Sequence, residues 1–153
     1  MSEEEKSLLT DEVRALIGKV TDAVTVTVKE EDARRMRDVI GDTDPRWAEG
    51  TGIAPPYAIA AFGGRPSRNM PFIMPSGLLT QQEWKFSRPF RVGEQLQSTT
   101  QVSDIRERLG GRYGHSVLVT TSTDYHDAEG NHVASALSTL TQFDPKRAQG
   151  KAE

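Results

Sequence analysis

A short segment between residues 41 and 47 holds the side chains best suited to acid–base chemistry. It reads Gly41-Asp42-Thr43-Asp44-Pro45-Arg46-Trp47, so two carboxylates precede a tryptophan. A carboxylate can take up a proton, whereas indole has no lone pair available for one, so Trp47 cannot act as a base. Asp42 also fits a structural role, in which it accepts hydrogen bonds from the backbone of its own loop. The segment thus offers a carboxylate base without an imidazole beside it.

The other residues that could do chemistry are few and scattered. The three histidines, His115, His126 and His132, are expected at strand starts or beside a turn, as surface side chains. Cysteine is absent, which excludes disulfides, thiol nucleophiles and thiolate metal sites, and no metal centre is predicted. The glycines around Arg112 fall between two expected strands, not before a helix, so they are no dinucleotide motif.

Length and composition favour a single globular domain. The chain has 153 residues, 35% of them hydrophobic and 27% charged, with a net charge of −3, which argues against a nucleic-acid surface. No stretch is long and apolar enough for a membrane span, and the acidic start MSEEEK is unlike a signal peptide, so a cytoplasmic location is expected. We expect residues 1–15 to form an N-terminal tail and the start of the first helix, 16–143 the domain, and 144–153 a flexible tail.

The elements before the 41–47 segment would place it at a helix end. A helix is expected within Leu8–Val20, with Thr10 as N-cap, and a strand at Val24–Val28 with its valines facing the core. A second helix, Glu30–Ile40, should end at Gly41 in a left-handed C-cap. Its buried stripe is predicted to be Ala33, Met36, Val39 and Ile40.

The elements after the segment change from a short helix to strands. Residues 42–52 are expected to be loop, and Pro55-Pro56 should start an apolar helix at Tyr57–Phe62 that is buried or backs onto a cavity. Gly63–Gly77 is then a long irregular connection. Strands follow at Leu79–Ser87, Gln95–Arg106, His115–Tyr125 and His132–Phe143. Short links between them predict a meander, and the whole an α+β domain with helices on one face of the sheet.

Several segments, in order, resemble the MaoC-like dehydratase family. They are Leu16 to Lys19, Ile40 to Pro45, Ala54-Pro55-Pro56, Gln82 to Pro89, Arg91 to Glu94 and the hairpin from Asp127 to Thr139. The similarity spans roughly Leu16 to Phe143. The subgroup that the chain most resembles is the N-terminal, fatty-acid-synthase-like dehydratase domain of the (R)-specific enoyl-CoA hydratase superfamily.

The resemblance implies a hot-dog fold, a curved antiparallel sheet wrapped around a central helix, and units that join edge to edge as double hot-dogs. Active members read Gly-Asp-x-Asn-Pro-x-His and hydrate enoyl-CoA, or run the reverse dehydration, with the Asp/His pair. Here Asp42 keeps its place as a remnant of that pair, Asp44 replaces the Asn and Trp47 replaces the His. The resemblance therefore implies a non-catalytic, substrate-shaping subunit. Its partner would be a catalytic MaoC-like subunit with an intact loop, in a heterodimer or heterotetramer.

The same resemblance suggests where an acyl or enoyl thioester of CoA would bind, with no further cofactor. Candidate acyl contacts are small, aromatic or methionine side chains near the expected apolar helix and the connection after it. They are Pro55, Pro56, Tyr57, Ala58, Ala61, Met70, Phe72 and Met74. Arg88 and Arg91 could contact the CoA phosphates, since guanidinium matches phosphate geometry. Ordinary packing and solvated surface positions explain these residues as well.

Two other functions remain open from the sequence. A homodimeric hot-dog thioesterase could use Asp42 or Asp44 as its base, because a carboxylate can serve in thioester hydrolysis. A non-enzymatic acyl-CoA-binding domain would need no base at all.

Overall fold

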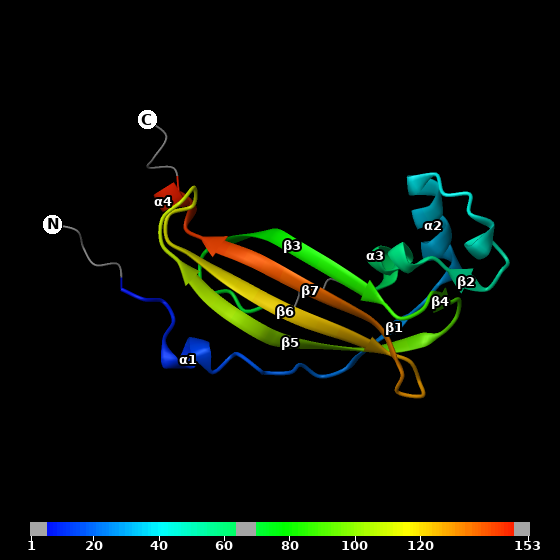
Figure 1. Ribbon diagram of the computed structural model, residues 1–153, viewed down its shortest axis with the longest axis horizontal. Helices are drawn as coiled ribbons and strands as arrows, with labels where there is room; N and C mark the ends of the chain where they lie inside the picture. The colour runs from blue at the N-terminus through cyan, green and yellow to red at the C-terminus, as the bar shows by residue number, and fades with distance from the viewer. Residues whose placement is uncertain (1–5, 64–69, 149–153) are drawn as a thin grey trace.

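One curved antiparallel sheet dominates the computed structural model, which describes residues 6–63 and 70–148 (Figure 1). Across the sheet the strands are β1 (Val24–Thr27), β5 (Gln95–Arg108), β6 (Ser116–His126), β7 (His132–Phe143) and β3 (Ser76–Phe86). All neighbouring pairs are antiparallel. A separate two-stranded ribbon joins β2 (Ile53–Ala54) to β4 (Phe90–Arg91). β1 and β3 are therefore the two edges of the main sheet.

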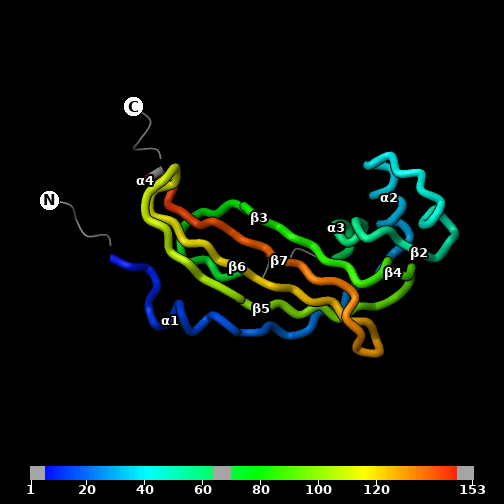
Figure 2. Tube along the Cα trace, in the orientation of Figure 1, coloured from blue at the N-terminus to red at the C-terminus, as the bar shows by residue number. Residues whose placement is uncertain are grey.

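The helices are short and gather at the ends of the sheet. They are α1 (Asp11–Arg14), α2 (Glu30–Ile40), η1 (Pro45–Trp47), η2 (Pro56–Ala58), α3 (Ile59–Phe62) and α4 (Pro145–Ala148). Figures 1 and 2 show α2 beyond one end of the sheet, beside β2 and β4, with α1 and α4 towards the other end. η2 runs directly into α3, so the chain is helical from Pro56 to Phe62. No helix in the described ranges is long and apolar enough to cross a membrane.

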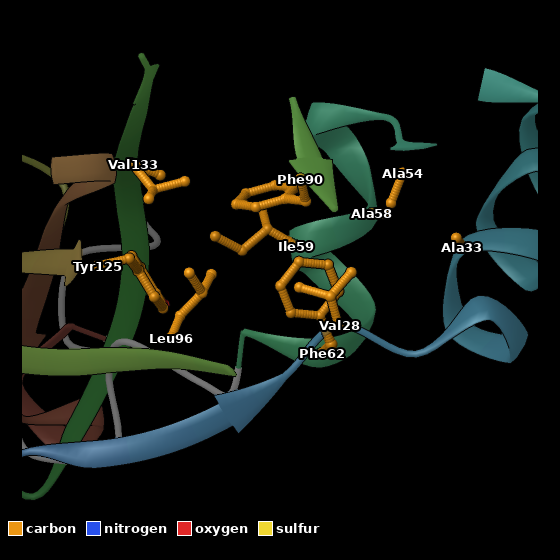
Figure 3. Close-up of a cluster of buried hydrophobic side chains, with 11 residues drawn as sticks. Val28, Ala33, Ala54, Ala58, Ile59, Phe62, Phe90, Leu96, Tyr125 and Val133 are labelled. Atoms are coloured by element: carbon orange, nitrogen blue, oxygen red, sulfur yellow. The ribbon is translucent and has the colours of Figure 1, made fainter. Parts of the chain in front are cut away.

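The inner face of the sheet carries two apolar clusters, one near each end. On β6, burial alternates from Val117 to Tyr125, so the odd-numbered side chains face inward. The proximal cluster, at the α3 end, comprises Val28, Ala33, Ala54, Ala58, Ile59, Phe62, Phe90, Leu96, Tyr125, Val133 and Ala134. Figure 3 shows Phe90, Leu96, Tyr125 and Val133 on the sheet side of α3, and Ala33 and Ala54 on its other side, towards α2. The distal cluster comprises Met70, Val102, Ile105, Val117, Val119 and Leu140.

Tyr125 fastens α3 to the sheet in the proximal cluster. Its buried hydroxyl donates to the carbonyl of Gly63, the residue after α3, at 2.8 Å. Gly63 must lack a side chain here, since a Cβ would lie 2.5 Å from Ile59 Cγ1 and 2.7 Å from its carbonyl oxygen. The curved antiparallel sheet with α3 on its inner face is the hot-dog fold that the sequence predicted.

Two polar side chains, half-buried Glu107 and buried Gln142, fasten the segments that cover the distal cluster. Glu107 accepts from the Ser7 hydroxyl at 2.6 Å and the Leu8 amide at 2.8 Å, and it contacts buried His115. These bonds lower the pKa of Glu107, the Ser7 bond most of all. Gln142, fully buried, accepts from the Ile73 and Met74 amides at 2.7 and 3.2 Å and donates to the Pro71 carbonyl at 2.6 Å. The polar groups thus hold two chain segments over the apolar core.

Several predicted elements have the expected bounds. α2 covers Glu30–Ile40, and Gly41 caps it in the left-handed conformation at φ 72°. Thr10 caps α1 by accepting from the Val13 amide, although the helix ends at Arg14 and not near Val20. β7 covers the predicted His132–Phe143, and β5 is two residues longer than expected.

The predicted meander is wrong at its first strand. β3 pairs with β7 and not with β5, which is the next strand of the main sheet along the chain. The chain between them forms β4, which pairs with β2, and this carries it past the end of the sheet to the far side. Of the predicted tails, residues 1–5 and 149–153 lie outside the described residues. The remainder is partly structured, because Ser7 bonds Glu107 and Pro145–Ala148 is helical.

Two burial predictions are also wrong. Val39 and Ile40 of the predicted α2 stripe are 79% and 54% exposed, and Arg37 is buried beside Ala33 in their place. The reason is that α2 lies beyond the sheet end and packs mainly on η2 and α3, so its last turn is uncovered. Val24, on edge strand β1, is likewise 54% exposed.

Candidate functional site

The candidate site is the loop between α2 and η2, and its centre is the Asp42 carboxylate. Asp42 Oδ2 accepts from the Tyr57 hydroxyl at 2.6 Å and from Trp47 Nε1 at 2.8 Å. Asp42 Oδ1 accepts from the Asp44 amide at 2.9 Å. The prediction that Asp42 accepts a hydrogen bond from the backbone of its own loop is therefore confirmed. Two side chains, Tyr57 and Trp47, donate to it in addition. All three partners are donors to the carboxylate.

The hydrogen bonds to Asp42 weaken it as a base. They lower the pKa of the carboxyl, the Tyr57 bond most of all, followed by the Asp44 amide and Trp47. Burial, reinforced by the negative charge of Asp42, raises the pKa of Tyr57 to about 12. At neutral pH the pair is therefore a carboxylate and a neutral phenol. A general base works best with a pKa near the operating pH, and Asp42 is shifted in the opposite direction.

Asp44 is equally engaged. Both of its carboxylate oxygens accept from the Arg46 guanidinium, at 2.7 to 3.1 Å, and Oδ1 also accepts from the Arg46 amide. These bonds lower the pKa of Asp44. The Arg46 guanidinium lies 4.3 Å from the centre of a Trp47 ring, as a cation–π contact. Each carboxylate of the loop is thus matched to donors from the loop or its neighbours.

Arg37 braces the loop from α2. Its guanidinium donates to the Trp47 carbonyl at 3.0 Å and to Glu30 Oε1 at 2.8 Å, and the residue is 6% exposed. Arg37 was not among the residues predicted to be buried on this helix, and its role was missed. The available signal was its spacing, because Arg37 lies four residues after Ala33 and therefore on the same helix face.

The start of η2 offers no backbone N–H donor at its N-cap or its first position. Here the N-cap is Pro55 and the first helical residue is Pro56, and neither has an N–H group. The segment from Gly41 to Trp47 therefore offers carboxylates without an imidazole, and the N-cap and first position of η2 add no backbone N–H group.

The predicted acyl contacts do not form one wall. Ala58 lies in the proximal cluster, whereas Met70 is buried in the distal cluster and Met74 packs against it. Ala61 is exposed, so the helix is not buried on every side, and Phe72 is 64% exposed. Pro55 is fully buried, and Pro56 is partly so. Of the predicted contacts, the structure brings only Tyr57 to the Asp42 loop.

The two arginines proposed for CoA phosphates have different surroundings. Arg88 is paired, since its guanidinium donates to both Glu94 oxygens at 2.9 and 2.8 Å and approaches Asp127 at 3.5 Å. These contacts raise the pKa of Arg88, the Glu94 bond most of all. Arg91 is exposed on β4 and its amide donates to Glu94. A phosphate would have to compete with Glu94 for Arg88.

The histidines take no part in the loop. His115 is 5% exposed and contacts Glu107 at the far end of the sheet, so its prediction as a surface side chain is wrong. The alternation of β6 explains this, because His115 lies two residues before inward-facing Val117. His132 is bonded weakly to Ser87 and Asp124 on the surface. Within the described parts of the chain, no group of three side chains is arranged to hold a metal ion.

We expect Tyr57→Phe to raise the pKa of Asp42 towards its ordinary value, because the largest cause of its depression is lost. A carboxyl whose pKa is lowered in the folded state stabilises the fold at pH values above the ordinary pKa of that carboxyl. This contribution is lost as the pH falls through the lower, folded-state pKa. The variant should therefore lose less stability on acidification than the parent. An NMR titration of the Asp42 carboxyl carbon checks the shift, with Tyr113→Phe as the control. An unchanged Asp42 pKa in Tyr57→Phe would contradict this expectation.

Comparison with known proteins gives a family and a fold. Residues 15–136 match the family described as FAS1-like, dehydratase domain region. No curated protein matches the chain. Among solved structures, the ChsH1-ChsH2 complex from Mycobacterium tuberculosis is 16% identical with a TM-score of 0.67, over 82% of this chain and 85% of that one. The HadBC (3R-hydroxyacyl-ACP dehydratase) complex from the same organism is 18% identical with a TM-score of 0.64, over 82% and 96%.

A third structure is similar at the level of the fold. The R-hydratase PhaJ1 from Pseudomonas aeruginosa is 19% identical with a TM-score of 0.59, over 84% of this chain and 82% of that one. At these identities the three structures establish the hot-dog arrangement, while the family match covers most of the chain. The chain belongs to the FAS1-like dehydratase domain family.

Proposed function

We propose that this chain is the non-catalytic, substrate-shaping subunit of a heteromeric enoyl-CoA hydratase or 3-hydroxyacyl thioester dehydratase. The observation that carries the proposal is the state of Asp42, whose carboxylate accepts bonds from Tyr57, Trp47 and the Asp44 amide. In the family pattern, a histidine stands where Trp47 donates here. A loop in this state can position its neighbours but has no group that exchanges a proton near neutral pH.

The partner in this proposal is a MaoC-like subunit with an intact Asp/His loop. Two of the similar structures are complexes by name, ChsH1-ChsH2 and HadBC, and the second is named as a dehydratase. The partner would supply acid and base, and this chain would bind the acyl tail of a CoA thioester without a further cofactor. A thioesterase is less well supported, because both candidate bases, Asp42 and Asp44, are held by donors.

Edge strand β3 is the surface that best suits such a partner. It has 11 residues, pairs with β7 alone, and is mostly exposed. Leu78, Leu79 and Phe86 on this strand are 47%, 50% and 37% exposed. A long apolar edge strand has unpaired backbone groups that another strand can complete. The opposite edge, β1, has only 4 residues and gives less to pair with.

Co-expression with a MaoC-like protein that carries an intact Asp/His loop tests the proposal. The two should co-purify, and the mixture should hydrate crotonyl-CoA about 10² to 10⁴ times faster than this chain alone, the usual contribution of a positioned acid or base. Leu79→Lys on β3 should abolish co-purification, whereas Val39→Lys, on the exposed turn of α2, should leave it intact. Rapid hydration by the isolated chain would refute the proposal. Hydrolysis of acyl-CoA by the isolated chain would favour the thioesterase. Binding of acyl-CoA without turnover in any mixture would favour an acyl-CoA-binding domain.

A further inference from the structure

Two buried hydroxyls face each other halfway along the inner face of the sheet. Thr121 on β6 and Ser138 on β7 are register partners, and both side chains point inward with Val119 and Tyr125. They are 0% and 1% exposed. Opposed residues of an antiparallel pair have Cβ atoms about 5 Å apart, so one oxygen atom can reach both hydroxyls. The pair lies between the proximal and distal clusters.

Neither hydroxyl has a hydrogen-bond partner in the part of the chain that the structure describes. By contrast, three pairs of threonines on neighbouring strands of the sheet bond one another. These pairs are Thr100 with Thr123, Thr120 with Thr139, and Thr80 with Thr141, at 2.8 to 2.9 Å. A buried hydroxyl without a partner is less stable than an apolar group of the same shape. Thr121 and Ser138 therefore require a partner from outside the sheet.

The surroundings define the chemistry of that partner. A hydroxyl both donates and accepts. Val102 on β5 and the adjacent inward row of Val119 and Leu140 are apolar. The inward row in the other direction along these strands is Thr123 and Ala136, and the Thr123 hydroxyl is already bonded to Thr100. A neutral oxygen on a hydrocarbon chain fits such a place, whereas a carboxylate would lack a counter-charge. On the other side, Ser138 has Gln82 as its register partner on β3, where it is exposed. The polar row thus reaches the edge assigned to the partner subunit.

We infer that Thr121 and Ser138 form a polar subsite for an acyl tail that carries a keto or hydroxyl group along its length. This inference rests on the proposed function and narrows its substrate class from any acyl thioester to an oxygen-bearing one. Apolar clusters on both sides suit the hydrocarbon before and after the oxygen. A buried water molecule could supply the same hydrogen bonds, and the experiment separates these two sources.

The test is calorimetric titration of the full chain with octanoyl-CoA and with its four derivatives that bear a keto group at carbon 4, 5, 6 or 7. At least one keto isomer should bind about tenfold more tightly than octanoyl-CoA. The double variant Thr121→Val/Ser138→Ala should bind that isomer and octanoyl-CoA equally, with octanoyl-CoA affinity retained. The matched control, Thr120→Val/Thr139→Val, removes a hydroxyl pair from the outer face of the same two strands and should keep the preference.

The outcomes separate the inference from the function on which it rests. Equal binding of all five thioesters by the parent chain, or a preference that survives in Thr121→Val/Ser138→Ala, would overturn the subsite and leave the proposed function standing. Absence of binding by every thioester would overturn both. The melting temperature of Thr121→Val/Ser138→Ala should equal or exceed that of the parent. A larger fall than in the control would mean that a resident water already satisfies the hydroxyls, and would also overturn the subsite.

Discussion

Arg37→Ala should lower the free energy of unfolding by about 3 kcal/mol, since it leaves a partly buried carboxylate and a carbonyl without their donor. Arg37 is 6% exposed and bonds both Glu30 and the Trp47 carbonyl. Its loss should also release the loop, because no other side chain from α2 holds the Trp47 backbone in the described structure. Urea unfolding measures the first effect, and amide hydrogen exchange of residues 42–47 measures the second.

Arg35→Ala is the control for Arg37→Ala. Arg35 is two residues earlier on the same helix and pairs with Glu31 at 2.8 Å, but its side chain is 69% exposed. An exposed pair at this spacing contributes about 0.5 kcal/mol or less. If the two variants lose similar stability, Arg37 is not the brace of the loop and the account of how Asp42 is positioned is wrong.

Gln142→Leu should be as damaging at the other end of the sheet. Gln142 is fully buried and makes three hydrogen bonds to the backbone of Pro71, Ile73 and Met74. Leucine is similar in size but leaves two amides and a carbonyl unpartnered, at about 1 kcal/mol or more for each group. We expect a loss of about 3 kcal/mol in urea unfolding, with faster hydrogen exchange at the Ile73 and Met74 amides.

Gln97→Leu is the matched control for Gln142→Leu. Gln97 lies on the exposed side of β5 and makes a single bond, to the Thr25 hydroxyl at 2.9 Å. Its replacement should change stability by about 0.5 kcal/mol or less, as is usual for surface positions. A Gln142→Leu variant that is as stable as Gln97→Leu would show that the Pro71–Met74 segment is held by apolar packing alone.

The strands and the main helix could be predicted because their signals are local. Alternation in residues 115–125 and 132–143 locates β6 and β7, and Gly41 locates the end of α2. Pairing could not be predicted in the same way. β3 pairs with β7 across more than forty intervening residues, because β4 leaves the sheet to pair with β2. That choice depends on contacts between distant segments, and no local pattern encodes it.

The polar braces were missed for a related reason. Arg37 and Gln142 are polar by type, and residue type alone predicts exposure for both. Each is buried because the backbone of a distant loop supplies its partners: the Trp47 carbonyl for Arg37, and residues 71–74 for Gln142. The position of each on an inward face was visible in the sequence. The distant loop whose backbone bonds each side chain could not be identified from the sequence.

The candidate site was predicted in part. The spacing of Asp42 and Trp47 identified the loop and the missing imidazole, and the structure brings the two together at 2.8 Å. Tyr57 was expected to contact the acyl tail, but its hydroxyl donates the shortest hydrogen bond to Asp42, at 2.6 Å. The distance of 15 residues between them includes η1 and β2, so only the folded loop places Tyr57 beside the carboxylate.

The rate of crotonyl-CoA hydration by an assembled complex that carries Asp42→Asn tests whether the Asp42 carboxylate of this chain takes part in the reaction. Asparagine is similar in size to aspartate, but its side-chain amide is neutral and does not act as a base. If the reaction takes place in the partner's loop, kcat should stay within about threefold of the parent complex, and the equivalent Asp→Asn change in the partner should abolish it. A loss of about 100-fold or more from Asp42→Asn in an intact complex would contradict the account, because it would place this chain's own carboxylate in the reaction.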